Sequence, residues 1–410
     1  MKILFVVSSF PALSETFILN QITGFIDAGH DVSILALKKV KTKAHPDVAN
    51  YQLMKKVTFI SIPQSKLKRS LRAIQSFLKI GLKMPRQTIN LLNSKKYGKF
   101  VLSLRPLLLA PFFQHKNSFD GIVSHYGSNG LMLDILKKEK WIKSSTPIFS
   151  FFHGNDVTGF VKRFGVGIYK PLRDSSIHCL PISKQWEYRL QELQIHNEKT
   201  SVHHMGVDIR KFLRVVVQPP KDNIELLIIG RLTEKKGIDI AIKAVYILRK
   251  VGLNCKLTIV GDGELKRELQ ELVSELRLGE SVFFSGWLDQ SHIQVIIREA
   301  DIIIQPSKTA TNGDQEGIPV SLMEALASGK LVISTWHSGI PELIQDNYNG
   351  WLVQEGDEKG LAHIIHKVIT LPLEEKKKIS KNARLTIARD FNIDLLNQQL
   401  IRRIECANEK

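Results

Sequence analysis

Two glutamates in residues 313–329, GDQEGIPVSLMEALASG, combine a residue type and a spacing that suit a polyhydroxylated ligand. Ile318 is biased toward an extended backbone because it precedes Pro319, and proline suits the first helical position because no N–H is needed there. We therefore expect Glu316 in a loop and Glu324 on an amphipathic helix of about three turns. The two carboxylates then flank a loop that becomes a helix.

The start of that helix is a second feature with a chemical use. Its first N–H groups, around Gly317, Val320 and Ser321, have no partner inside the helix and lie at its positive end, which suits a diphosphate. A carboxylate one or two turns further along can accept both hydrogen bonds of a vicinal diol such as a ribose. The combination describes a nucleotide-sugar site, and the alternative is that both glutamates are ordinary surface carboxylates.

Two cations form a third feature. The apolar run of residues 224–229 predicts a buried strand, and GRLTEKKG follows it as a tight turn that enters a helix near Gly237. Arg231 and Lys236 flank this turn. Arginine offers a planar fork and lysine a point charge, so together they can hold a diphosphate, unless they are merely solvated loop charges.

Alternating strands and helices must position these groups. Such alternation indicates parallel βαβ units, in which ligands bind outside the carboxyl ends of the strands. The sequence G-D-G at residues 261–263 lacks the third glycine of a dinucleotide fingerprint, since Lys266 stands there, and a nicotinamide enzyme is therefore not expected. The predicted strands are residues 2–7, 31–37, 121–124, 147–152, 179–183, 224–229, 256–260, 282–284, 301–305 and 331–334.

The chain resembles the family-four retaining glycosyltransferases, which have the two-domain GT-B fold. The resemblance rests on the E-x7-E pair within residues 316–324, on the GRL, K and G positions within 230–237, on HGND at 153–156 and on SGIPE at 338–342. The run FPALSETFILNQI, residues 10–22, resembles in particular bacterial exopolysaccharide transferases of the colanic-acid and amylovoran type. This loop lacks the paired glycines of many family members.

The resemblance implies an α/β architecture with two Rossmann-like domains facing across a cleft and a last helix that crosses back onto the first domain. The linker composition of residues 218–220, QPP, places the boundary. We expect an acceptor-binding domain at residues 1–215, a nucleotide-sugar-binding domain at 216–390 and the returning C-terminal helix at 391–410.

The resemblance also implies roles for individual residues. His153 would reach the donor sugar, Arg231 and Lys236 would neutralise the leaving nucleoside diphosphate, and Glu316 would face the hydroxyls of the donor sugar, which makes these four the catalytic set. The main chain at 287–288 would read the base. The donor-binding set is Glu324, which would hold the ribose, with Gly317, Ile318, Pro319, Val320, Gly230, Gly261, Trp287 and Leu288.

The acceptor-side candidates are Ser14 and Glu15, which follow the first predicted strand. Ser14 can also be read as the cap of the helix that begins at Glu15, and a glutamate in the first turn favours the helix by its charge. An acceptor role and a helix cap are both open for these residues. His125, at the end of another strand, is expected to be structural.

No metal and no cofactor are expected. D-x-D, the carboxylate pair that holds a divalent metal in the other large glycosyltransferase fold, does not occur in the sequence, and the nucleotide sugar is a substrate. The resemblance implies retention of the anomeric configuration, with the departing phosphate accepting the proton of the acceptor and no protein nucleophile.

Length and composition limit the class of protein. A chain of 410 residues with 43% hydrophobic content can form two domains, each with its own core. Three isolated cysteines support neither a disulfide framework nor a zinc site, and no window approaches about 18 consecutive apolar residues. We expect a cytoplasmic protein.

The net charge of +18 calls for an anionic partner, and much of it is local. Between Asp47 and Asp120 there is no acidic residue but fourteen lysines and arginines, and residues 65–84 have a basic amphipathic pattern. We expect contact with an anionic membrane surface through residues 55–99, peripheral and on the inner face. An ordinary domain helix with a solvated basic face is the alternative, and no nucleic-acid motif accompanies the charge.

These observations predict transfer of a sugar from a nucleotide-sugar donor to a lipid-linked oligosaccharide in bacterial surface polysaccharide biosynthesis. A nucleotide-sugar epimerase of the same fold and a non-catalytic, basic membrane-binding scaffold are the two alternatives.

Overall fold

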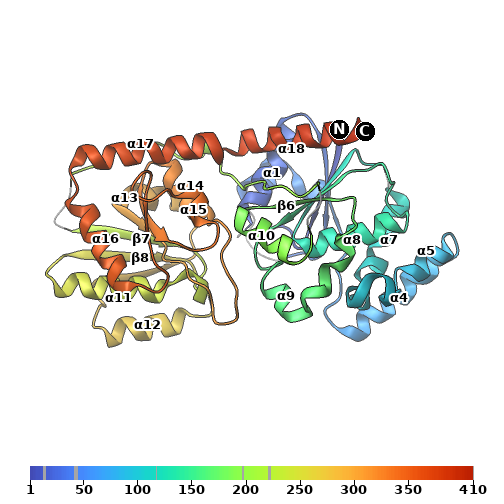
Figure 1. Ribbon diagram of the computed structural model, residues 1–410, viewed down its shortest axis with the longest axis horizontal. Helices are drawn as coiled ribbons and strands as arrows, with labels where there is room; N and C mark the ends of the chain where they lie inside the picture. The colour runs from blue at the N-terminus through green and yellow to red at the C-terminus, as the bar shows by residue number, and fades with distance from the viewer. Residues whose placement is uncertain (13–14, 41–44, 117, 196–197, 220–222, 410) are drawn as a thin grey trace. The chain divides into compact units, whose positions relative to one another are not determined.

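The computed structural model describes residues 1–12, 15–40, 45–116, 118–195, 198–219 and 223–409. The chain divides into two compact units (Figure 1): unit 1 contains Met1–His204 and Asp394–Lys410, and unit 2 contains Met205–Ile393. The C-terminal segment therefore belongs to the unit in which the chain begins. The boundaries of the compact units are therefore 204/205 and 393/394, and those predicted from the sequence are 215/216 and 390/391.

Unit 1 is built on a parallel sheet in which β1 lies between β2 and β4. The pairing Lys2↔Asp31 and Ile3↔Gly121 sets the register of these three strands. The order β3-β2-β1-β4-β5-β6 reverses direction at β1 and β4, which makes their carboxyl ends the expected ligand-binding point. The strands are β1 (Lys2–Val7), β2 (Asp31–Ala36), β3 (Val57–Phe59), β4 (Gly121–His125), β5 (Ile148–Phe152) and β6 (His178–Pro181).

The helices of unit 1 include the last one of the chain. Arg403 of α18 donates to the Ser201 hydroxyl at 3.0 Å, and Asn408 donates to the Asp120 carbonyl at 2.9 Å. These contacts fix α18 on unit 1. The helices are α1 (Thr16–Asp27), α2 (Pro46–Asn50), α3 (Leu53–Lys56), α4 (Lys66–Gly81), α5 (Pro85–Asn90), α6 (Ser94–Tyr97), α7 (Arg105–His115), α8 (Gly127–Lys138), α9 (Gly159–Phe164), α10 (Lys184–Glu192) and α18 (Ile393–Asn408), with 3-10 turns η1 (Gly98–Ser103) and η2 (Val166–Leu172).

Helix α4 falls where the sequence predicts a basic amphipathic helix. Its apolar stripe does not pack on the sheet: Leu67, Leu71, Ile74 and Leu78 are all more than half exposed. The basic residues Lys68, Arg72 and Lys79 are exposed as well, so contact with an anionic membrane surface and an ordinary helix with a solvated basic face both stay predictions. None of the helices in the described residues is long and apolar enough to cross a membrane.

Unit 2 repeats the strand order of unit 1 in its own six-stranded parallel sheet. The order β12-β11-β10-β7-β8-β9 reverses at β7 and β10, so the ends of these two strands are its expected ligand-binding point. The strands are β7 (Ile224–Ile229), β8 (Cys255–Val260), β9 (Val282–Gly286), β10 (Ile302–Ile304), β11 (Leu331–Thr335) and β12 (Trp351–Val353). The helices are α11 (Ile238–Lys250), α12 (Lys266–Glu275), α13 (Gln290–Glu299), α14 (Val320–Ala327), α15 (Ile340–Leu343), α16 (Glu358–Thr370) and α17 (Leu373–Asp390), with 3-10 turns η3 (Ile209–Lys211) and η4 (Glu234–Lys236).

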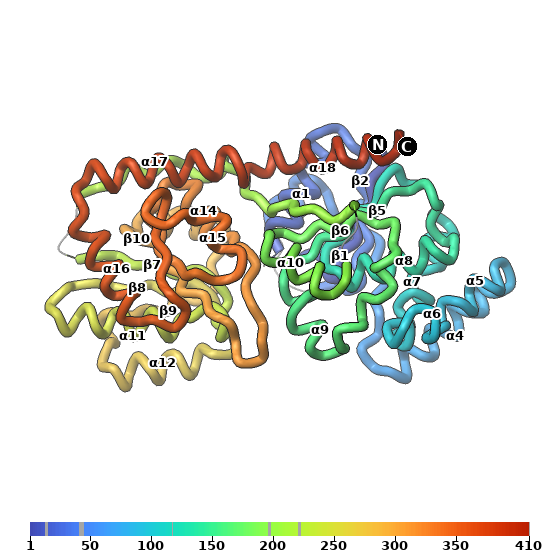
Figure 2. Tube along the Cα trace, in the orientation of Figure 1, coloured from blue at the N-terminus to red at the C-terminus, as the bar shows by residue number. Residues whose placement is uncertain are grey.

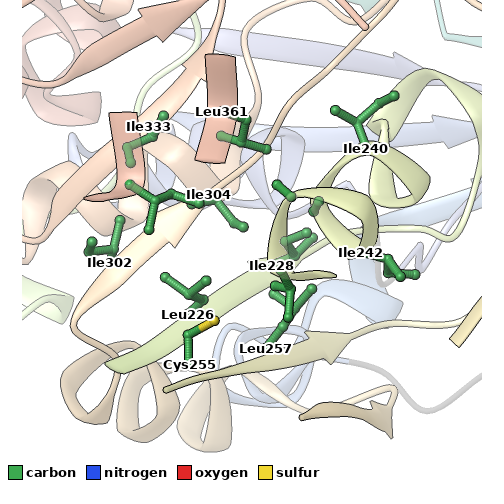
Figure 3. Packing of buried hydrophobic residues seen from close by; sticks show 14 of the residues in the cluster. Leu226, Ile228, Ile240, Ile242, Cys255, Leu257, Ile302, Ile304, Ile333 and Leu361 are labelled. Atoms are coloured by element: carbon green, nitrogen blue, oxygen red, sulfur yellow. The ribbon is translucent and has the colours of Figure 1, made fainter. Parts of the chain in front are cut away.

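Both faces of the second sheet are buried, as its near-continuous apolar strands predict. Leu226 and Ile228 of β7 point to the cluster beneath α11 and α16, where Figure 3 shows them among other aliphatic side chains. Leu227 and Ile229, one residue on, point to the cluster beneath α14. The sequence expectation of a mixed α/β protein with two parallel sheets is confirmed.

Candidate functional site

The reversal point of the second sheet brings together charged residues that are far apart in the sequence. The loop after β7 carries Lys235 and Lys236, and the long loop after β10 carries Asp314 and Glu316. Lys236 Nζ lies 3.3 Å from Glu316 Oε2, while Lys235 Nζ lies 3.7 Å from Glu316 Oε1 and 3.0 Å from Asp314 Oδ2. The structure thus places two of the four predicted catalytic residues in one ion pair.

Burial and charge act against each other in this ion pair. Burial by itself would raise the pKa of Glu316, but the attraction of Lys236 and Lys235 outweighs it and leaves the pKa below its ordinary value. Burial lowers the pKa of Lys236, against the attraction of Glu316, and the positive charges of Lys235 and Arg231 lower it further. Arg231 itself is exposed beside this pair. Arg231 is therefore an accessible cation next to Lys236, whose side chain is only 12% exposed and whose charge is balanced by Glu316.

Two predicted donor-binding glycines lie where backbones approach closely. Gly261, at the end of β8, has φ +139°, and a Cβ there would lie 1.9 Å from the carbonyl oxygen of Gly230 at the end of β7. Lys236 lies over Gly230, because a Cβ on Gly230 would meet its Cε at 3.1 Å. Only glycine at 261 lets the two strand ends come this close.

Two residues that the sequence analysis missed hold the Glu316 loop. The Glu316 N–H donates to His337 Nε2 at 3.1 Å, so the proton of the neutral imidazole is on Nδ1, which lies 2.6 Å from Glu355 Oε1. Glu355 also accepts from the Thr309 N–H at 2.7 Å. His337 lies directly before the SGIPE turn and two residues after β11. A histidine just after a predicted strand, as at 125 and 153, is the sequence signal that indicates it.

Helix α14 follows this loop and is shorter than expected. It begins at Val320 and has eight residues, while Pro319 precedes it as an extended N-cap residue at φ −64° and ψ 124°. The expectation of proline inside the first turn and of about three turns is wrong, because the extended conformation persists through Pro319. Glu316 lies in the loop, and Glu324 lies on the helix.

Glu324 is buried next to a side chain from another strand end. Its Oε1 accepts from Gln290 Nε2 at 3.2 Å. Burial raises the pKa of Glu324 to about 7, although the Gln290 hydrogen bond opposes the shift. Gln290 was not predicted as a site residue, and it comes from the first turn of α13, after the predicted base-binding pair. In that pair Trp287 is exposed, whereas Leu288 packs on the core.

The reversal point of the first sheet carries a second polar group. Tyr126, after β4, donates to Glu15 Oε1 at 2.6 Å, and Glu15 follows β1. The helix α1 begins at Thr16 rather than Glu15, and Glu15 is its N-cap residue, whose side chain makes no capping hydrogen bond. Ser14 lies outside the described residues.

His153 follows the neighbouring strand β5 in unit 1. Its Nε2 lies 3.1 Å from His125 Nδ1, and its ring lies 4.9 Å from that of Tyr126 between centroids. The backbone turn beneath it is held by Asp156, whose carboxylate accepts the N–H groups of His153 and Gly154 at 2.9 and 2.8 Å. Burial lowers the pKa of His153 to about 3, so the imidazole is neutral at physiological pH.

In the described part of the chain, no group of three or more histidine, cysteine, aspartate or glutamate side chains is arranged to hold a metal ion. The charged side chains at the reversal point of the second sheet are cations paired with carboxylates. What this arrangement can bind is an anion beside Arg231 and a diol beside Glu324.

Known proteins share both the sequence and the architecture. The model of the glycosyl transferases group 1 family matches residues 209–386, which lie within unit 2. A protein of Escherichia coli named as a colanic acid biosynthesis glycosyltransferase, WcaL, is 36% identical over 98% of each chain. The amylovoran biosynthesis glycosyltransferase AmsK of Erwinia amylovora is 34% identical over 99% of each chain.

A solved structure supports the fold. HepE of Anabaena, crystallised with UDP and glucose, covers 99% of each chain with a TM-score of 0.72 at 19% identity. That structure has the GT-B architecture that the resemblance implied. The chain therefore belongs to the group 1 glycosyltransferases of the GT-B fold, together with the WcaL and AmsK enzymes of bacterial exopolysaccharide biosynthesis.

Proposed function

We propose that the protein transfers a hexosyl residue from a nucleotide-sugar donor to a lipid-linked oligosaccharide during exopolysaccharide assembly. The transfer retains the anomeric configuration and needs no metal ion. Because the acceptor carries a lipid, the enzyme works in the cytoplasm at the inner face of the cell membrane, as a peripheral protein.

One observation carries this proposal: the cations of one strand end and the carboxylates of the next meet at the reversal point of the second sheet. Arg231 is exposed beside the ion pair of Lys236 and Glu316, and Glu324 lies on α14, the helix that follows the Glu316 loop. This is the position at which a parallel sheet binds nucleotides. Full-length similarity to two exopolysaccharide glycosyltransferases supports the same function.

The donor-site roles follow from chemistry. Arg231 and the N–H groups at Gly317 and Val320 bind the diphosphate, and Glu324 accepts the hydroxyls of the ribose. Glu316 accepts hydroxyls of the sugar while Lys236 keeps it ionised. Trp287 is available to the base by its exposed face, with main-chain groups at Leu288. The neutral imidazole of His153 suits a hydrogen bond to a sugar hydroxyl.

In the transfer step, the bond between the anomeric carbon and the diphosphate oxygen breaks, and a bond from the acceptor oxygen to the same carbon forms on the same face. The acceptor proton passes to the departing phosphate oxygen. Negative charge grows on the diphosphate, so Arg231 and Lys236 stabilise the transition state more than the ground state. On the acceptor side, the candidates are Ser14 and Glu15, which follow β1 in the sequence.

The first test is a thermal-shift screen of the full-length protein against nucleotides and nucleotide sugars of uridine, guanosine and adenosine, with magnesium or with chelator. A ligand that binds only the folded protein raises its melting temperature. We expect one base to stabilise the protein equally in both buffers, and Glu324→Ala to abolish the shift.

Product analysis with that donor completes the test. Membrane extract containing the lipid-linked acceptor should yield a glycosylated lipid whose new linkage has the anomeric configuration of the donor by NMR. An isomerised sugar formed without acceptor would identify an epimerase instead, and no shift with any nucleotide would favour a non-catalytic scaffold.

A further inference from the structure

Helix α4 presents an apolar stripe on the side that faces away from its own unit. Leu67, Leu71, Ile74 and Leu78 are 71%, 55%, 56% and 64% exposed. Their spacing of four, three and four residues places them within about 60° of one another around the helix. Four aliphatic side chains in one narrow line are an unusual surface for an isolated domain.

The opposite side of α4 is packed, so the exposed stripe is presented by a rigid helix. Ala73 and Ile80 are buried, and the segment that follows is bound to the body of unit 1 by Glu139. That carboxylate accepts from Asn90 at 2.8 Å and from Lys96 at 2.6 Å, and also from the hydroxyl of Tyr97. Figures 1 and 2 show α4 and α5 on the outside of unit 1, beyond α7.

Basic residues follow the stripe along one side. Lys68, Arg72 and Lys79 are exposed and lie about 100–140° around the helix from Leu67, and the exposed Lys83 follows the end of the helix. No acidic residue occurs in residues 48–119 to neutralise them within the segment. The apolar stripe with cations along one side is complementary to a surface that has anionic groups outside and an apolar layer beneath them.

We propose that α4 is an in-plane anchor by which the protein lies on an anionic lipid bilayer. The leucine stripe enters the boundary between headgroups and acyl chains while the basic ridge contacts anionic headgroups. This proposal rests on the proposed function, since a lipid-linked acceptor lies in such a bilayer, and it names the surface that brings the enzyme there. A second copy of the chain fits this surface less well, because an antiparallel two-fold pairing of α4 would bring the two basic ridges together.

The test is flotation of the full-length protein with vesicles of phosphatidylcholine alone or mixed with phosphatidylglycerol. We expect binding to the mixed vesicles that weakens with salt. Leu67→Gln with Leu78→Gln should weaken it about a hundredfold, because each leucine loses its burial in the bilayer. Lys68→Gln with Lys79→Gln and Lys83→Gln should abolish the preference for phosphatidylglycerol.

A matched pair of substitutions controls for general loss of apolar surface. Val251 and Leu385 of unit 2 are 69% and 53% exposed, so Val251→Gln with Leu385→Gln removes similar side chains from elsewhere. This control should bind vesicles as the wild type does. Equal weakening by the two pairs, or unchanged binding in the Leu67/Leu78 variant, overturns the proposal.

Two further readouts separate the remaining outcomes. A fluorophore on Leu78→Cys, with the exposed Cys406 changed to serine, should shift to the blue and be quenched by brominated lipids. Sedimentation of the wild type as a dimer that the Leu67/Leu78 variant breaks would assign the stripe to self-association instead. The Leu67/Leu78 variant leaves the nucleotide site untouched, so its thermal shift with the donor nucleotide should be unchanged. Loss of vesicle binding in this variant therefore tests the anchor. Absence of any nucleotide shift in the wild type tests the proposed function.

Discussion

The ammonium of Lys236 lies 3.3 Å from the carboxylate of Glu316, and both groups are largely withdrawn from solvent. The pair joins the loop after β7 to the loop after β10, which are the two strand ends where the second sheet reverses. It keeps Glu316 ionised in a buried position and joins two of the four residues that the sequence predicts as catalytic.

Substituting one member of this pair should lower the free energy of unfolding more than substituting both members together. Lys236→Met leaves the buried Glu316 with only the more distant Lys235, and Glu316→Gln removes the carboxylate that faces Lys236. We expect each to lower the free energy of unfolding by roughly 3 kcal/mol and transfer by at least about a hundredfold. The double variant should be more stable than either single variant. Urea unfolding and transfer rates measure both effects; free-energy losses that simply add would show that the two groups do not interact.

Donor binding should strengthen with pH through the titration of Glu324. The folded protein binds this proton more tightly than the unfolded chain, because burial raises the pKa from 4.5 to about 7. Stability therefore falls as pH rises from the lower value through the higher one, by roughly 3 kcal/mol in total. Ribose hydroxyls need the ionised carboxylate, so affinity for a nucleotide sugar should rise about tenfold per pH unit below that pKa and level off above it.

Calorimetric titration with a nucleotide sugar, which carries no terminal phosphate that titrates in this range, measures the effect. Glu324→Gln should bind more weakly and with little dependence on pH. A wild-type affinity that does not change across the pKa would contradict the assignment of Glu324 to the ribose.

His337 should act by positioning Glu316. In His337→Ala the Glu316 N–H loses its acceptor inside the protein, which we expect to cost about 1–3 kcal/mol of stability and to reduce kcat more than donor affinity. His337→Gln supplies a carbonyl near the same place and should recover part of the loss. His292, whose contact with Asp289 is exposed, provides the control, since His292→Ala should change neither quantity. Equal behaviour of the Ala and Gln variants would argue against the hydrogen bond as the cause.

Gly261 should tolerate no side chain. Its φ of +139° is strained for other residues, and a Cβ would collide with the Gly230 carbonyl, so we expect Gly261→Ala to lower the melting temperature by roughly 5 °C or more. Gly279→Ala is the control, because a Cβ there meets nothing within 4 Å. Matching melting curves for the two variants would show that the backbones at the ends of β7 and β8 can separate freely.

Much of the fold was readable from local pattern. The apolar runs at residues 2–7 and 224–229 are strands with those bounds, because a strand buried on both faces has a signal within its own few residues. The three-residue strands β3 and β12 were not predicted, whereas the equally short β10 was, because three consecutive isoleucines form its strand. The placement of Glu316 in a loop and Glu324 on a helix was also local, since it depends on the residues beside Pro319.

The sequence by itself determined the residue types at the strand ends, the βα alternation and the family, since these depend on neighbours along the chain. Only the tertiary structure decided which of those residues meet. The order of strands in the sheet joins Lys236 to Glu316, sets His337 beneath the Glu316 loop and buries Glu324 beside Gln290. It also decided that the α4 leucines face outward, because a helical pattern shows that a stripe exists but the packing of neighbouring elements determines which side is covered.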